Sequence, residues 1–182
     1  MKKELEGKTA IITGAGRLRG IGRATAVALA KLGANIVVTG TGKSPETFPQ
    51  DEKDVGWRDI ESTAEQVRDE GSLAKTVITD ITKESEVKFL INSTLETFGS
   101  LDILINNAAA PYGEDRVPIV EIENEIFKKV INTKVYGSFL CSKYAATAMI
   151  DQKLGGRIIN LSSSAGKEGS ARMGAYNAAN FA

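Results

Sequence analysis

Short apolar runs alternate along this chain with segments in which apolar residues recur at helical spacing. Short apolar runs bounded by turn residues are typical of buried strands, whereas the helical recurrence is typical of amphipathic helices. The runs predict strands at 8–13, 35–39, 73–79, 101–106 and 156–161. The periodic segments predict helices at 22–32, 59–70, 84–98 and 121–149, the last with a bend near Asn132, and a helix that begins near Gly174.

Regular alternation of strands and helices is the signature of a parallel sheet whose crossover helices cover both faces. The chain is therefore predicted to have an α/β fold, and its 182 residues fit one domain. Only the stretch 40–58 breaks the rhythm, because it holds two prolines and is long for a strand-to-helix loop. We interpret it as a surface excursion whose Trp57 packs its end onto the body, with a role beside a bound cofactor as the alternative.

Composition excludes several classes of protein. Lys and Arg together number 23, as do Asp and Glu, without a long run of either sign, which argues against a nucleic-acid or membrane surface. No apolar run has the length of a membrane span, and the first residues lack the apolar core of a secretory signal. The single Cys141 fits a reducing compartment, so a cytoplasmic location is predicted, with the thiol as a small buried side chain.

The absence of histidine restricts the chemistry further. It removes Ser-His-Asp triads and most zinc sites, so no metal site is predicted. Any proton transfer must use Tyr, Lys, Asp, Glu or the lone Cys.

A glycine-rich loop lies between the first predicted strand and the first predicted helix. It reads Thr13-Gly14-Ala15-Gly16-Arg17-Leu18-Arg19-Gly20-Ile21-Gly22. Glycines let the backbone turn tightly and approach a pyrophosphate, while the helix N-terminus supplies free N–H groups and a positive dipole end. A plain turn would explain the glycines alone, but their place between strand and helix favours dinucleotide binding.

Two features bear on which nicotinamide cofactor fits. A NAD site commonly places an acidic residue at the end of the second strand, where it accepts the ribose hydroxyls. Here the segment 39–43 carries no acid, and Arg19 and Lys43 are basic groups that could meet a 2'-phosphate. The sequence therefore favours NADP, with NAD as the alternative, although solvated surface charges would explain both side chains equally.

Together with the glycine loop, the residues Asn106-Asn107-Ala108-Ala109, Asn132, Ser163 and Tyr176 resemble the short-chain dehydrogenase/reductase family in order and spacing. The resemblance covers essentially the whole chain. It implies a Rossmann-type three-layer fold with sheet order 3-2-1-4-5-6-7, here one NAD(P)-binding domain over 1–182 that is incomplete at its C-terminal edge. The last strands and the segment that covers the substrate would then be absent, leaving an apolar sheet edge exposed.

The resemblance also implies functions for particular residues. The loop has two more residues than the family pattern between Gly14 and Gly20, so the first glycine's role is ambiguous. Ala109 stands where the family usually has glycine. With the residues chosen from the loop and from charge, the candidate cofactor-binding positions are Gly14, Gly16, Arg19, Gly20, Ile21, Gly22, Thr41, Asp80, Ile81, Asn106 and Ala108.

Three residues match the catalytic positions. Tyr176 matches the general acid/base, and Ser163, one of three adjacent serines, matches the group that orients the substrate oxygen because it lies 13 residues before Tyr176. Asn132 matches the asparagine that holds a water in the proton relay. The implied reaction is hydride transfer between NAD(P) and a secondary alcohol or ketone, in a homodimer or homotetramer.

The family's catalytic lysine has no counterpart, because Asn180 stands four residues after Tyr176. A free tyrosine has a pKa of about 10, and a nearby ammonium favours its phenolate. A residue four positions on lies on the same helix face, one turn along. Asn180 is neutral and shorter than lysine, so a rival hypothesis is a catalytically impaired dinucleotide-binding protein of the same fold.

Overall fold

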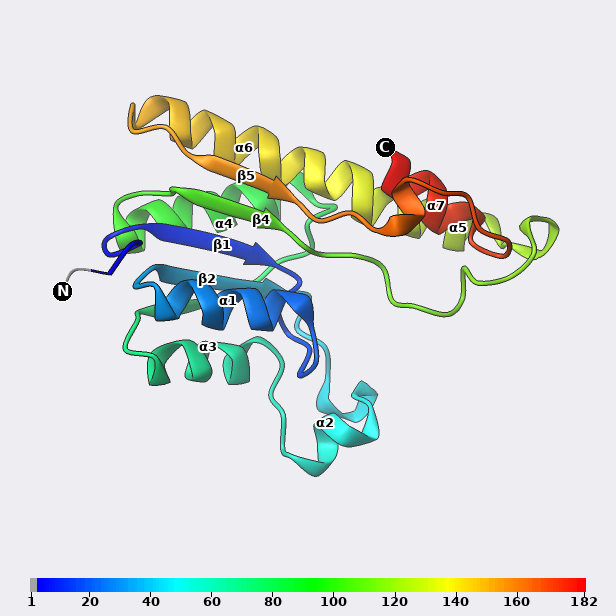
Figure 1. Ribbon diagram of the computed structural model, residues 1–182, viewed down its shortest axis with the longest axis horizontal. Helices are drawn as coiled ribbons and strands as arrows, with labels where there is room; N and C mark the ends of the chain where they lie inside the picture. The colour runs from blue at the N-terminus through cyan, green and yellow to red at the C-terminus, as the bar shows by residue number, and fades with distance from the viewer. Residues whose placement is uncertain (1–2) are drawn as a thin grey trace.

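The sheet is parallel throughout and has the order β3-β2-β1-β4-β5 in the computed structural model, which describes residues 3–182 (Figure 1). This order matches the first five strands of the implied topology. The strands are β1 (Thr9–Thr13), β2 (Asn35–Gly40), β3 (Ala74–Ile78), β4 (Ile103–Asn106) and β5 (Arg157–Asn160). All five predicted strands are present, each within two residues of its expected ends.

Helices cover both faces of the sheet. The α-helices are α1 (Ile21–Lys31), α2 (Gln50–Asp54), α3 (Ile60–Asp69), α4 (Glu84–Phe98), α5 (Asn124–Ile131), α6 (Ser138–Asp151) and α7 (Gly174–Phe181). Short 3-10 turns are η1 (Pro45–Thr47), η2 (Ile119–Glu121) and η4 (Ser164–Gly166), and η3 (Asn132–Gly137) is a π-helical segment between α5 and α6. The expected bend near Asn132 is therefore a π-helical stretch.

The period of two along each strand divides the core into two layers. In β1, Ile11 points to the layer shared with α4 and α6, whereas Ile12 points to the layer shared with α1 and α3. Both side chains are fully buried, and full burial of such a side chain stabilises the fold by about 1.5–3 kcal/mol. Cys141 lies in the first layer, and burial raises the pKa of its thiol to about 12, as expected for an inert core residue.

β5 forms an edge of the sheet. Its four residues are exposed, among them Ile158 and Ile159, as the resemblance implied for this strand. Within residues 3–182, no helix is long and apolar enough to cross a membrane.

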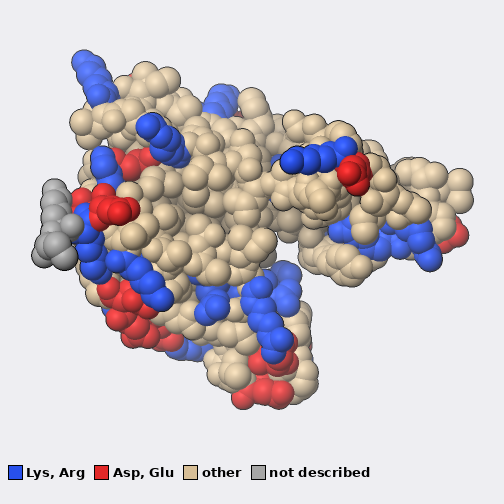
Figure 2. All heavy atoms as spheres, viewed as in Figure 1, with Lys and Arg blue, Asp and Glu red and all other residues tan. Residues whose placement is uncertain are grey.

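The carboxyl ends of all five strands meet at one side of the molecule, where the arrowheads point in Figure 1. α2 lies on one flank of this side, and α5 and α7 lie on the other. In the space-filling view, the surface is hollowed between these two parts, and acidic and basic side chains mix over the α2 region (Figure 2). In open α/β sheets, ligands bind outside the carboxyl ends of the strands, so the fold predicts a ligand site in this hollow.

Candidate dinucleotide and active site

A cleft of about 780 Å³ opens at the carboxyl ends of the strands. It brings together two of the three predicted catalytic residues, Asn132 and Tyr176, with most of the predicted cofactor positions. Those cofactor positions are Gly14, Gly16, Gly20, Ile21, Thr41, Asp80, Ile81 and Ala108. The residues are up to 162 positions apart, between Gly14 and Tyr176, so the fold and not local sequence unites them.

The glycine loop has the shape that a phosphate cradle requires. Gly14 has a φ of +66°, and a Cβ there would lie 2.8 Å from the Cα of Ala108. Only glycine therefore fits this close approach of two backbones. α1 starts at Ile21 without an acidic residue in its first turn, so its free N–H groups can receive an anion. These features fit a dinucleotide pyrophosphate.

Asn107, which sequence reasoning did not select, fastens this loop to the end of β4. Its side-chain amide donates to the carbonyl oxygens of Thr13 and Gly14 at 2.8 and 2.9 Å. The Thr13 hydroxyl in turn accepts from the backbone N–H groups of Asn107 and Ala108 at 3.0 and 3.1 Å. Its place beside Asn106 in the Asn-Asn-Ala segment is the sequence signal that could have identified Asn107.

Four predicted residues do not line the cleft. Gly22 packs below it, where a Cβ would lie 2.6 Å from the Asn107 amide nitrogen. Asn106 is buried and donates to Ser142 and Asn160, so it joins β4 to α6 and β5. Arg19 is 82% exposed and pairs with Asp51 at 3.1 Å. These three placements favour supporting or surface positions over direct cofactor contact.

Ser163 is the fourth. Its hydroxyl accepts from the Ala165 backbone N–H at 3.2 Å and caps η4, while the neighbouring Ser162 lines the cleft. The Ser162 hydroxyl donates to the Asn180 carbonyl oxygen at 3.0 Å. Ser163 is thus engaged within its own turn and Ser162 with α7, and the choice of Ser163 still rests on its spacing from Tyr176.

Tyr176 lies on α7, which is tied to the loop after β5. The Asn177 amide donates to the carbonyl oxygens of Ala165 and Glu168 at 2.8 and 2.9 Å. The Arg116 guanidinium stacks over the Tyr176 ring, 3.8 Å from its centroid, and pairs with Asp115 at 3.5 Å, which is an ion pair and not a hydrogen bond. This cation–π contact was missed, because nothing in the sequence around Arg116 marks it.

Position 180 carries no positive charge into the cleft. Asn180 is 9% exposed, and its amide donates to the Tyr176 carbonyl oxygen at 2.9 Å, within its own helix. A cation does reach the cleft from η3, because Lys134 lines it and donates to the Leu161 carbonyl oxygen. Burial lowers the pKa of the Lys134 ammonium. Asn132 is the first residue of η3; it is exposed and lines the cleft.

The excursion 40–58 is docked onto the glycine loop. The Trp57 indole N–H donates to the Gly16 carbonyl oxygen at 2.6 Å, as expected from a packed Trp57. Glu52, which is 2% exposed, accepts from the Arg17 side chain at 2.7 Å and from the Leu18 backbone N–H at 3.0 Å. The longer glycine loop, a departure from the family pattern, and the excursion therefore contact each other. The segment is mostly exposed, as expected of a surface excursion, and its buried Trp57 and Glu52 tie it to the glycine loop.

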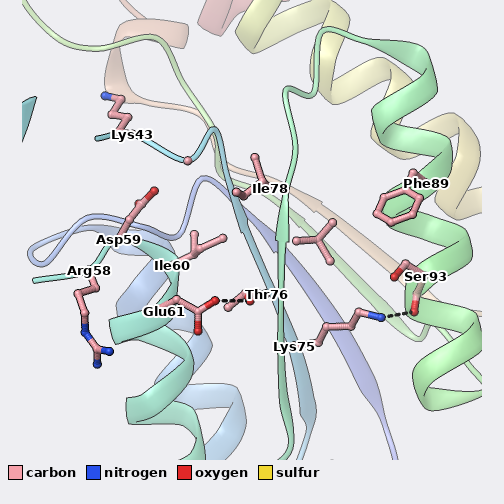
Figure 3. Close-up of a pocket in the computed structure, with 12 residues that line it drawn as sticks. Lys43, Arg58, Asp59, Ile60, Glu61, Lys75, Thr76, Ile78, Phe89 and Ser93 are labelled. Carbon is pink, nitrogen blue, oxygen red and sulfur yellow. Dashed lines mark hydrogen bonds between the residues drawn. The ribbon is translucent and has the colours of Figure 1, made fainter. Parts of the chain in front are cut away.

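The docked segment brings Asp59 to the cleft. Its Oδ1 lies 1.5 Å from the point where a Cβ on Gly16 would sit, so the carboxylate touches the glycine backbone. Burial raises the pKa of the Asp59 carboxyl, and the backbone N–H and ammonium group of Lys43 oppose this rise. Asp59 also lines a second groove, of about 690 Å³, between α3, β3 and α4 (Figure 3).

The comparisons with known proteins agree with this geometry. The profile of the short chain dehydrogenase family matches residues 8–182. The chain is 38% identical over 178 residues to the short chain dehydrogenase/reductase astE of Aspergillus oryzae, covering 98% of this chain and 62% of that protein. It is 37% identical over 181 residues to the 2,5-dichloro-2,5-cyclohexadiene-1,4-diol dehydrogenase of Sphingobium indicum, covering 98% of this chain and 63% of that one.

Two solved dehydrogenase structures also superpose on this chain. The crystal structure of NAD+-bound xylitol dehydrogenase superposes with a TM-score of 0.84 at 31% identity, covering 98% of this chain and 62% of that chain. That of carveol dehydrogenase from Mycobacterium avium in complex with NAD gives 0.85 at 28% identity, with the same coverages. The chain thus spans about three fifths of the length of the proteins it matches.

Proposed function

Because the chain belongs to the short-chain dehydrogenase family, we propose that it serves hydride transfer between a nicotinamide dinucleotide and a secondary alcohol or ketone. One observation carries the proposal: Tyr176 and Asn132 line the same cleft as the glycine loop and the N-terminus of α1. A phosphate cradle and a proton-transferring phenol in one cleft are what such a reaction needs.

In the proposed reaction, the dinucleotide supplies the hydride chemistry when bound. Gly14, Gly16 and the N-terminus of α1 hold its pyrophosphate. Tyr176 takes the hydroxyl proton of the alcohol during oxidation and returns it to the carbonyl oxygen during reduction. Ser163 orients that oxygen, and Asn132 holds a water that connects the site to solvent.

The rival function is dinucleotide binding without turnover. Asn180 favours it, because its amide is engaged with the backbone of its own helix and supplies no charge beside Tyr176. The glycine loop serves both functions equally, so only turnover distinguishes them.

The test uses the intact protein with NAD and NADP, a panel of secondary alcohols and ketones, and the absorbance of the reduced nicotinamide. Turnover that Tyr176→Phe lowers by about 10²–10⁴-fold, without loss of dinucleotide binding, would support the proposal. Tyr144→Phe is the matched control, because Tyr144 lies on α6 outside the cleft lining. Dinucleotide binding without turnover of any substrate would establish the rival.

Two further expectations complete the proposal. We expect a homodimer or homotetramer, supported by exposed apolar side chains on η3 and α6, namely Tyr136, Phe139 and Ile150. We also expect a cytoplasmic location. Either NAD or NADP fits the proposed reaction. Of the two cations behind the expected NADP preference, Arg19 lies outside the cleft lining and Lys43 lies within it.

A further inference from the structure

The end of β2 has no acidic side chain of its own. The strand ends at Gly40, which has no side chain at all. The absence of an acid there was the main ground for expecting NADP. In space, however, the carboxylate of Asp59 occupies this point: a Cβ on Gly40 would lie 3.8 Å from each of its two oxygens.

Three contacts define where this carboxylate sits. Asp59 lies against Gly16 in the glycine loop, in front of Gly40 at the end of β2, and beside Lys43. Figure 3 shows its carboxylate pointing from the start of α3 toward the segment that carries Lys43, away from Glu61. The angle between the glycine loop and the end of the second strand is where an acidic group meets the adenosine ribose in dinucleotide folds.

The backbone of Asp59 is held in an unusual conformation. Its φ is +54° and its ψ is −131°, which is strained for a residue with a side chain. The neighbouring anchor explains how this is maintained, because Trp57, two residues earlier, is bonded to Gly16. The docked excursion thus fixes the main chain that presents the carboxylate.

We propose that Asp59 accepts hydrogen bonds from the hydroxyl groups of the adenosine ribose and excludes a 2'-phosphate, so that this chain selects NAD over NADP. The acid directly follows the excursion, at the start of α3, and does not come from the end of the second strand. A carboxylate beside a 2'-phosphate would repel it, whereas a ribose hydroxyl donates to it. Lys43 is the cation that opposes this preference, and Arg17 is already paired with the buried Glu52. The inference rests on the proposed nicotinamide site, although it does not require turnover.

The test measures dissociation constants for NAD and NADP by calorimetry, with AMP and 2',5'-ADP as fragments that lack the nicotinamide. The wild-type protein should bind NAD at least tenfold tighter than NADP, and AMP tighter than 2',5'-ADP. Asp59→Asn should weaken NAD binding by about 10-fold or more, as expected for a hydrogen bond to a charged group, and should narrow or reverse the NAD:NADP ratio.

Two further variants keep the test decisive. Asp59→Gly also removes the carboxylate but relieves the positive φ, so it should fold at least as well and show the same change of ratio. Glu61→Gln is the matched control, because Glu61 lies on the same helix outside the cleft lining, where it accepts from Thr76. It should leave the ratio unchanged.

The outcomes separate this inference from the proposed function. Tighter NADP than NAD binding by the wild type, or an unchanged ratio in both Asp59 variants, would overturn the Asp59 assignment alone. Failure of the wild type to bind either dinucleotide would overturn the proposed function and this inference together. Binding with the expected ratio but without turnover would leave the Asp59 assignment standing and refute only the catalytic proposal.

Discussion

The cleft has two halves, one formed by the glycine loop and one that carries Tyr176, and they differ in whether departures from the family pattern are matched by contacts. On the glycine-loop side, the longer loop is a departure from the family pattern that is matched by contacts, because it meets the excursion through Trp57 and Glu52. On the Tyr176 side, the departure at Asn180 is matched by none, since its amide turns back to its own helix. In the proposed function, the half that binds the cofactor keeps supporting contacts, whereas the half that carries Tyr176 has no lysine at position 180.

This difference has a physical origin. Dinucleotide binding uses backbone N–H groups and close backbone approach, which many side chains can support from several directions. Acid/base catalysis needs a particular charge beside a particular phenol, and few positions can supply it. Arg116 lies over the Tyr176 ring face, and the half-buried Lys134 lines the same cleft. Binding and turnover should therefore respond to different substitutions.

The largest expected effect is on the catalytic half. Asn180→Lys places an ammonium one turn after Tyr176 on the same helix face. We expect kcat to rise about 100-fold, which corresponds to about 2.7 kcal/mol of transition-state stabilisation. Steady-state kinetics with one substrate and a saturating dinucleotide would measure this rise.

Asn180→Gln is the control for this change, because it lengthens the side chain without adding charge. Its kcat should stay near that of the wild type. A Lys variant that keeps the wild-type melting temperature but gains no activity would show that position 180 is not the missing part.

The next effect is on the cofactor half. Trp57→Phe keeps an apolar ring but leaves the Gly16 carbonyl oxygen without its 2.6 Å donor. An unpaired buried acceptor costs about 1–3 kcal/mol, so we expect dinucleotide dissociation constants to rise about tenfold while kcat at saturation stays the same. Calorimetry and kinetics on the same preparation would separate the two.

Val55→Ala changes the same segment at a side chain that is 62% exposed, and it should leave both quantities unchanged. Equal dinucleotide affinity in the Trp57 and Val55 variants would show that the excursion does not support the glycine loop.

Much of this architecture follows from local sequence. The strands and long helices were predictable because their apolar spacing repeats over many residues, and the glycine loop because glycine is needed where φ is positive or backbones meet, as at Gly14. The family spacing also located Tyr176 and Asn132 in one cleft.

The parts that escaped prediction depend on packing between distant segments. Asp59 precedes a helix like an ordinary N-terminal acid, and only the docking of Trp57 on Gly16 turns it toward the cleft. α2 is too short to show a helical period. Asn106 and Asn107 are adjacent and chemically identical, so only the strand geometry assigns one to the core and the other to the glycine loop.

The smallest expected effect on dinucleotide binding comes from the far end of the sheet, and it tests whether the contrast is confined to the cleft. Asp102 lies before β4, at the opposite end of the sheet from the cleft. Burial raises its pKa, but bonds from Lys8, the Thr9 N–H and Ser100 outweigh this, so the pKa of the carboxyl lies below its ordinary value. Its contribution to stability is therefore present above the unfolded pKa of about 3.9 and is lost as the pH falls through the folded value.

We expect Asp102→Asn to lower the free energy of unfolding by about 1–2 kcal/mol at pH 7. The difference from the wild type should shrink in acid, as urea titrations at several pH values would show. The dinucleotide affinity of the Asp102 variant should not change. The control is Asp151→Asn, because Asp151 is an exposed carboxylate at the end of α6, and it should change neither the free energy of unfolding nor the dinucleotide affinity. A loss of dinucleotide affinity in the Asp102 variant would mean that the cleft depends on the far end of the sheet, and the contrast between its two halves would then not be local.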